Sequence, residues 1–323
     1  MKAITIEQCV SDYNKNYNIV FSNILAEIDT NIDKIIINDP IKKCRFCDKT
    51  EPEISFKKQA HAIPELIGNK TIFSNNECDS CNSKFSSLLE DHLGKYLGLW
   101  RTMMQIKGKN GIVSYKAPDG ISRIDMAKTG LELQSFEEDP IFECNDQERT
   151  FIIKGYRQPY VPIAVFKSFV KMAISVMPYE LLSYFNETKK WLLENNHEIS
   201  NYDIQPIFTI ASSISGKKPF NELLITILCR KNDFLKVPFM QMLLFFGNLG
   251  YQIIVPCKPK DFHLSNQPIN IASFPHPAFK SNESNRVIGY SQIDFSGKSI
   301  VRNEKTSVTM GYEHSIVNGK TST

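Results

Sequence analysis

The chain has 323 residues, of which 42% are hydrophobic and 23% are charged, a balance typical of folded globular proteins and not of disordered ones. Its 38 basic and 35 acidic residues leave a net charge of +3, which indicates no particular partner. No apolar run reaches the roughly 18 residues that span a bilayer, and no signal peptide is visible. We therefore expect a cytoplasmic protein with no membrane partner.

The first two segments of the chain differ in pattern. Residues 1–40 are expected to form an N-terminal helical arm, because apolar side chains recur at helical spacing over residues 4–37. The run Asn38-Asp39-Pro40 then provides a stop signal. Residues 41–105 form a cysteine-containing module, whose second half is expected to be a helix that begins close to Asn82.

Residues 106–323 are expected to form a larger α+β region that contains antiparallel sheet. Alternating patterns predict strands over residues 106–160, around a turn at Pro118-Asp119-Gly120, and again over residues 203–301, with a hairpin turn at 247–250. Residues 162–196 have the apolar spacing of helices. From Asn303 the chain is polar and predicts a loose tail. The fold class expected for the whole chain is α+β.

The eight cysteines fall into two groups. Four form two C-x2-C pairs, Cys44 with Cys47 and Cys78 with Cys81. Without a secretion signal, such pairs indicate metal binding more than disulfides. Four thiolates complete a tetrahedral Zn2+ site, and a closed site of this kind supplies folding energy and not catalysis. The others are expected to be ordinary core thiols: Cys9, Cys144, Cys229 and Cys257.

His61 and Asn82 add a chemical function to this pattern, because both lie within the cysteine module. His61 lies between the two pairs, and Asn82 follows the last cysteine at the start of the expected helix. If zinc clamps the intervening hairpin to that helix, the two side chains approach each other. An imidazole accepts a proton from water near neutral pH, and an amide oxygen is a hard ligand that suits Mg2+ or Mn2+. Phosphodiester hydrolysis needs such a base beside a divalent ion.

Over residues 44–93 the chain resembles the HNH endonucleases with the ββα-metal fold. The pattern C-x2-C-x13-H-x16-C-x2-C-N is similar to that of their zinc-clamped branch, with a layout like that of phage recombination endonucleases. Further positions agree with the family pattern: Pro64, Glu65, Gly68, Phe85 and Glu90. The resemblance implies that His61 is the general base and that Asn82 binds a catalytic Mg2+ or Mn2+ ion. It also implies that Glu90 is a second ligand of that ion and that the four cysteines hold a structural Zn2+.

One position departs from the family pattern. The family usually has an acidic metal ligand just before the catalytic histidine, and this chain has Ala60 there. Five residues are candidates to replace that ligand: Glu65, Asp79, Glu90, Asp91 and His92. If none of them does so, the ion binds more weakly or the module is partly degenerate.

The function that follows is metal-dependent hydrolysis of phosphodiester bonds in DNA. The basic, acid-free stretch 95–116 is a candidate for contact with DNA phosphates, and a solvated surface is its alternative. By analogy, a nuclease module beside a large second region suggests a restriction or anti-phage effector, with residues 106–323 sensing an activating ligand or a partner protein. A homodimer joined through the apolar helices at 163–192 is a further option. The competing hypothesis is a zinc-stabilised nucleic-acid-binding or scaffold protein that has lost cleavage, which Ala60 favours and which His61 and Asn82 oppose.

Overall fold

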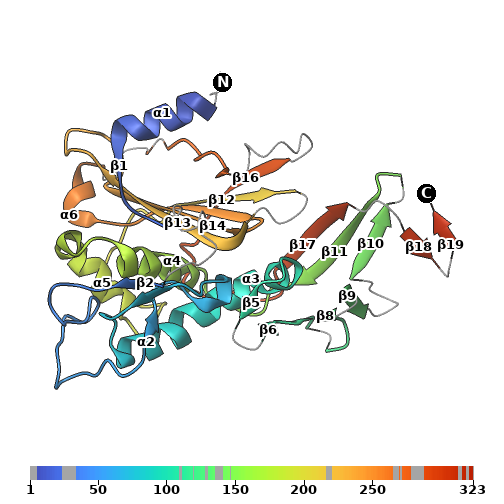
Figure 1. The fold of residues 1–323 in the computed structure, drawn as a ribbon, viewed down its shortest axis with the longest axis horizontal. Coiled ribbons are helices and arrows are strands. Elements are labelled where there is room, and N and C mark those ends of the chain that lie inside the picture. Colours follow the sequence, from blue (N-terminus) through green and yellow to red (C-terminus); the bar gives the residue numbers. More distant parts are fainter. Residues whose placement is uncertain are drawn as a thin grey trace.

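A six-stranded antiparallel sheet forms one layer of the fold, and a helical layer separates it from the cysteine module (Figure 1). The computed structural model describes residues 6–23, 34–108, 111–118, 120–127, 130–134, 141–145, 147–215, 220–264, 269, 271–277, 287–311, 315–317 and 320–322. In sheet order the strands are β1 (Tyr17–Ser22), β13 (Phe220–Arg230), β14 (Met240–Gly247), β15 (Leu249–Ile254), β12 (Thr209–Ile214) and β16 (Ile288–Ile293). The expected strands at 203–301 and the hairpin turn between β14 and β15 are confirmed.

Helix α4 (Pro162–Val176) forms the centre of the molecule. All of its residues are buried, because the large sheet and the cysteine module pack on it, as the position of the helix in Figure 1 shows. A proline is its first residue, where a missing N–H costs no helical hydrogen bond. A 3-10 segment η4 (Tyr179–Phe185) and helix α5 (Asn186–Leu192) follow. Because every residue of α4 is buried within one chain, α4 has no free face for the homodimer interface considered over residues 163–192.

The cysteine module has a small sheet on one side and a helix on the other. Its sheet order is β2 (Ile35–Ile37), β4 (Ile72–Ser74) and β3 (Ala60–His61), with β2 parallel and β3 antiparallel to β4. A 3-10 turn η2 (Glu65–Ile67) lies between β3 and β4. The helix expected near Asn82 is confirmed as α2 (Asp79–Phe85), a π-helical turn η3 (Ser86–Glu90) and α3 (Asp91–Met103).

Small antiparallel sheets extend from the end of α3 (Figure 1). Their strands are β5 (Lys107–Gly108), β6 (Gly111–Ile112), β7 (Tyr115–Lys116), β8 (Arg123–Ala127), β9 (Gly130–Gln134), β10 (Phe142–Asn145), β11 (Thr150–Tyr156) and β17 (Lys305–Gly311), followed by β18 (Ser315–Val317) and β19 (Lys320–Ser322). The strands expected over residues 106–160 are confirmed. The predicted turn at 118–120 includes Asp119, which lies outside the described residues.

Two expectations about the ends of the chain are wrong in part. The helix expected over residues 4–37 is present as α1 (Ile6–Asn16), but Tyr17–Ser22 and Ile35–Ile37 are strands, and residues 24–33 lie outside the description. The loose tail expected from Asn303 is also wrong, because β17 pairs along the whole of β11 and buries Val308. In both places an open sheet edge offers hydrogen bonds that local spacing does not reveal.

Two short elements complete the description, the helix α6 (Lys258–Asp261) and the 3-10 turn η5 (Phe262–Leu264). Of the cysteines expected in the core, Cys229 and Cys257 are buried, but Cys144 is exposed, which corrects that expectation. It lies on β10, whose four residues are all exposed. The side chain of Cys9 is outside the description. Across the described part of the chain, no helix combines the length and the apolar character needed to cross a bilayer.

Candidate metal centre and active site

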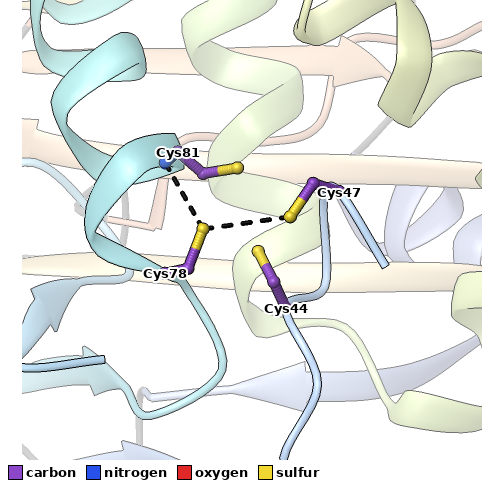
Figure 2. A group of neighbouring side chains, drawn as sticks. All are labelled: Cys44, Cys47, Cys78 and Cys81. Atoms are coloured by element: carbon purple, nitrogen blue, oxygen red, sulfur yellow. Dashed lines mark hydrogen bonds between the residues drawn. The ribbon is translucent and has the colours of Figure 1, made fainter. Parts of the chain in front are cut away.

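The four paired cysteines converge on one point, as Figure 2 shows. Their Sγ atoms all lie within 4.8 Å of one another, and the Cys47 and Cys78 sulfurs are 3.9 Å apart. Zn–S bonds of about 2.3 Å place the sulfurs of a tetrahedral site about 3.8 Å apart. Cys44, Cys78 and Cys81 are buried and Cys47 is half-buried. The size, the ligand type and the burial of the cluster therefore fit a structural Zn2+ ion.

Local backbone structure prepares this cluster. The first pair lies in a tight turn, closed by a hydrogen bond from the Asp48 N–H to the Cys44 carbonyl (3.0 Å). The second pair opens α2, where the Cys78 sulfur accepts the N–H of Cys81 (3.5 Å). Cysteine thus takes the N-cap position that Ser, Thr, Asp or Asn usually occupies. A metal ion bound here joins the turn to the first turn of the helix.

The thiols perturb each other strongly. A hydrogen bond from Cys81 lowers the pKa of Cys44 to about 5, and the same contact raises the pKa of Cys81 far above its ordinary range. Burial raises the pKa of Cys47 to about 11. Four thiolates so close together repel each other unless a cation compensates them. The cluster is therefore chemically suited to a metal ion as well as geometrically.

His61 lies at the end of β3, half-buried. Its ring packs against that of Phe73 on the neighbouring strand, with ring centroids 4.7 Å apart. Burial lowers the pKa of the imidazole, and the nearby carboxylates of Glu65 and Glu90 oppose that shift. A histidine in this environment is largely neutral at physiological pH, the state in which it accepts a proton.

A lysine from outside the cysteine module connects His61 with Glu90. The Lys171 ammonium, on α4, donates to the backbone carbonyl oxygen of His61 (3.1 Å). It also lies 3.6 Å from the Glu90 carboxylate and 3.1 Å from that of Glu77. The side chains of Lys171 and Glu77 are 0% exposed. Because a lysine is almost never buried without a partner, this cluster is a specific contact between α4 and the module.

The two glutamates differ in environment. Burial raises the pKa of Glu77 to about 7, against the opposing effect of the Lys171 ammonium. Burial also lowers the pKa of Lys171, but Glu77 and Glu90 outweigh it, so that the pKa lies above its ordinary value. Glu90 is 18% exposed and so keeps access to solvent. Lys171 therefore holds Glu90 through an ion pair, while the Glu90 carboxylate remains accessible to a ligand.

The π-helical turn η3 places Glu90 relative to Asn82. Asn82 is half-buried in α2, and its N–H bonds the Cys78 carbonyl (2.9 Å). Eight residues along an α-helix leave two side chains about 80° apart around the axis. The π turn is closed by a hydrogen bond from the Asp91 N–H to the Ser86 carbonyl, and it inserts one extra residue into the helix. The extra residue offsets this angle, so Asn82 and Glu90 lie on the same face of the helix, about two turns apart.

The structure narrows the candidates for the carboxylate missing at Ala60. Asp79 accepts hydrogen bonds from the Ser55 hydroxyl and from two backbone N–H groups, so it holds a loop. Asp91 pairs with Lys95 (2.6 Å), and His92 accepts the N–H of Val161 (3.1 Å). Glu65 and Glu90 are the two carboxylates that act on His61. Of the five candidates, these two therefore remain as possible replacements for the missing oxygen ligand.

Sequence reasoning did not identify Lys171, although a signal was present. Lys167 and Lys171 are the two charged residues of a helix whose other residues are apolar or serine, and a buried lysine must be paired. The partner could not be named, because Lys171 lies 110 residues from His61 in the chain. The π turn has no recognised sequence signal.

The cysteine cluster, the β3–β4 hairpin and helix α2 together define a zinc-clamped ββα-metal module. Residues 44–97 match the family model of the HNH endonucleases, so this segment is an HNH endonuclease domain. Comparison with curated proteins and with solved structures gave no match. The likeness of layout to phage recombination endonucleases is therefore not shown.

Proposed function

We propose that the protein is a metal-dependent endonuclease that hydrolyses phosphodiester bonds in DNA. The observation that carries the proposal is the position of Lys171, which touches both the strand of His61 and the carboxylate of Glu90 inside the HNH segment. Lys171 thus links the strand that carries the proposed base to a proposed carboxylate ligand. This link supports the proposal, because hydrolysis of a phosphodiester requires a base beside a bound divalent ion.

Each residue has a stated role in this proposal. The neutral imidazole of His61 takes a proton from water, whose oxygen bonds to phosphorus while the bond from phosphorus to the leaving sugar oxygen breaks. Asn82 and Glu90, with Glu65 nearby, provide oxygen atoms for a Mg2+ or Mn2+ ion. When bound, such an ion neutralises charge on the phosphate and on the leaving oxygen. The cysteines hold the structural Zn2+ that fixes the helix to the hairpin.

His61→Ala is expected to slow cleavage of supercoiled plasmid by about 10^2- to 10^4-fold, because it removes the general base. Wild type and variant are incubated with plasmid in Mg2+, in Mn2+ and in EDTA, and the products are separated on a gel. Wild type should cut in either metal and not in EDTA. His263→Ala, a histidine outside the HNH segment, is the matched control and should cut like wild type.

Two results would contradict the proposal. Equal cutting by wild type and His61→Ala would show that His61 is not the general base. No cutting by a wild type that carries one zinc per chain would favour the competing function, a zinc-stabilised nucleic-acid-binding or scaffold protein, which the alanine at position 60 supports.

The cleavage rate is expected to rise as the pH increases from 5 and to reach its plateau before pH 7. The base is the neutral form of His61, and burial lowers the pKa of that histidine below 6.5. The midpoint of the acidic limb should therefore lie under 6.5, measured as initial rates of cleavage at saturating Mn2+ over pH 5 to 8. A midpoint above 7 would show that a different group limits the rate.

By analogy with other nucleases that carry a large second region, we include cleavage of foreign DNA in restriction or anti-phage defence in the proposal. Residues 106–323 would then respond to an activating ligand or a partner protein. Helix α4 supports such coupling, because it belongs to that region and supplies Lys171 to the HNH segment. To test this role, cells that express wild type and cells that express His61→Ala are challenged with phage. Equal protection by the two proteins would contradict a role in defence.

A further inference from the structure

A groove of about 370 Å³ begins at Glu90 and runs along α3 toward β7. One wall is the helix, with Gly94, Gly98 and Arg101, and the other is the segment 113–116. The second wall lies outside the part of the chain that matches the HNH family. From Glu90 to Arg101 the helix rises about 16 Å, roughly the axial rise of four to five nucleotides of one strand at about 3.4 Å each.

Arg101 has the environment of a residue that binds an anion. Its Nε donates to the Leu66 carbonyl (2.8 Å), which fixes the guanidinium at the side of the groove. A Cβ at Gly94 would lie 3.7 Å from Nη1, and a Cβ at Gly108 would lie 3.8 Å from Nη2. Burial lowers the pKa of this arginine. Among the residues that the structure describes, no carboxylate lies within 4.0 Å of the guanidinium, so its desolvated charge lacks a protein counter-ion.

The charges along the groove are unevenly distributed. Glu90 and Asp91 lie at one end, and Asp91 pairs with Lys95, which neutralises that lysine. Lys116 lies at the other end with Arg101, and its side chain is exposed. The acidic end therefore suits a divalent ion, and the basic end suits a phosphate. Lys109, another residue of the basic stretch 95–116, lies outside the described residues.

The helical wall of the groove is open at Gly98. A Cβ added at Gly98 would meet nothing within 4 Å, so packing inside the protein does not require glycine at this position. Glycine also weakens a helix relative to alanine. A bound molecule that approaches the helix backbone closely would give a reason for a glycine here.

We propose that this groove binds the sugar–phosphate backbone of DNA, with Arg101 and Lys116 contacting phosphates several nucleotides from the bond that is cut. The inference rests on the proposed function, whose scissile phosphate lies at the Glu90 end. A guanidinium binds phosphate through two parallel hydrogen bonds, a geometry that lysine does not provide. The groove would thus fix the register of the strand and not its sequence.

Binding of a labelled 30-base-pair duplex, followed by fluorescence anisotropy in Ca2+ between 50 and 200 mM salt, tests the groove. Arg101→Gln should bind about tenfold more weakly at the upper salt concentration. The plot of log K against log salt should become shallower by about 0.9 for each lost phosphate contact, in Arg101→Gln and in Lys116→Gln. Lys236→Gln removes an exposed charge between β13 and β14, outside the groove, and should leave the slope unchanged.

Gly98→Leu separates binding from folding. The Cβ of the new side chain would meet nothing within 4 Å, and leucine favours a helix more than glycine does. We therefore expect a melting temperature equal to or above that of wild type, while DNA affinity falls about tenfold or more. Lys116→Gln serves the same purpose, because Lys116 is exposed and its loss leaves the core intact. Arg101→Gln is compared only after its zinc content and melting temperature match those of wild type.

The outcomes distinguish this proposal from the nuclease itself. If wild type cuts plasmid but the three groove variants bind and cut like wild type, the groove proposal is overturned and the nuclease stands. If wild type never cuts but binds duplex with a salt dependence that requires Arg101 and Lys116, the groove proposal is supported and the nuclease proposal is overturned. If wild type neither binds nor cuts, both are overturned.

Discussion

Replacement of Cys78 by serine is expected to eliminate zinc binding and to unfold the HNH segment. Cys78 is both a ligand and the N-cap of α2, since its sulfur accepts the Cys81 N–H. Structural zinc contributes about 10–16 kcal/mol in zinc-finger peptides near pH 7, which is as large as the whole stability of a typical domain, about 5–15 kcal/mol. Zinc per chain, measured by atomic absorption, should fall from one to near zero, and tryptic cleavage within residues 44–97 should become rapid.

Cys144→Ser is the matched control for this experiment. Cys144 is exposed on β10 and outside the cluster, so its replacement should leave zinc content, protease resistance and melting temperature unchanged. A Cys78→Ser protein that retained one zinc per chain and the wild-type melting temperature would contradict the assignment of the cluster as the structural metal site.

Replacement of Lys171 by methionine is expected to lower the free energy of unfolding by about 3–5 kcal/mol. Among the described residues, Lys171 is the one cation within 4.0 Å of the Glu77 carboxylate, and both side chains are fully buried. Without Lys171, the buried Glu77 carboxyl must either keep an uncompensated charge or take up a proton, and breaking a buried pair in this way costs far more than the pair contributes. Urea unfolding, followed by circular dichroism, measures the loss as a change in midpoint.

The double variant Lys171→Met, Glu77→Gln should recover much of that stability, because no charge is then left unpaired at Glu77. Cleavage should nevertheless stay slow in the double variant, since Glu90 and the His61 carbonyl still lack their common partner. Lys167→Met is the matched control. Lys167 is the other buried lysine of α4 and pairs with Glu194 (3.5 Å), so its loss should lower stability without changing the cleavage rate of folded protein.

Two results would contradict this role of Lys171. A Lys171→Met protein as stable as wild type would show that Glu77 is uncharged or finds another partner. A double variant that is stable and also cuts at the wild-type rate would show that Lys171 only balances Glu77, and that it does not position Glu90.

Much of the metal centre was predictable from sequence because its signals are local. Two residues between paired cysteines bring both sulfurs to one side of a tight turn or of a first helical turn, whatever surrounds them. The helix after Cys81, the helices after Pro162 and the hairpin turn at Gly247 likewise depend on neighbours in the chain. The HNH resemblance over residues 44–93 agrees with the family match at 44–97 for the same reason.

Features that depend on distant partners were not predictable. Strands β1, β2 and β17 form because they pair with sheet edges far away in sequence. This pairing outweighs the helical spacing of apolar residues in β1 and β2, and the polar composition of β17. Lys171 reaches the candidate site because packing places α4 against the HNH segment, and the groove exists because β7 lies opposite α3. Residue patterns specify turns and ligand sets, whereas a buried ion pair or a groove needs the long-range contacts that only the folded chain makes.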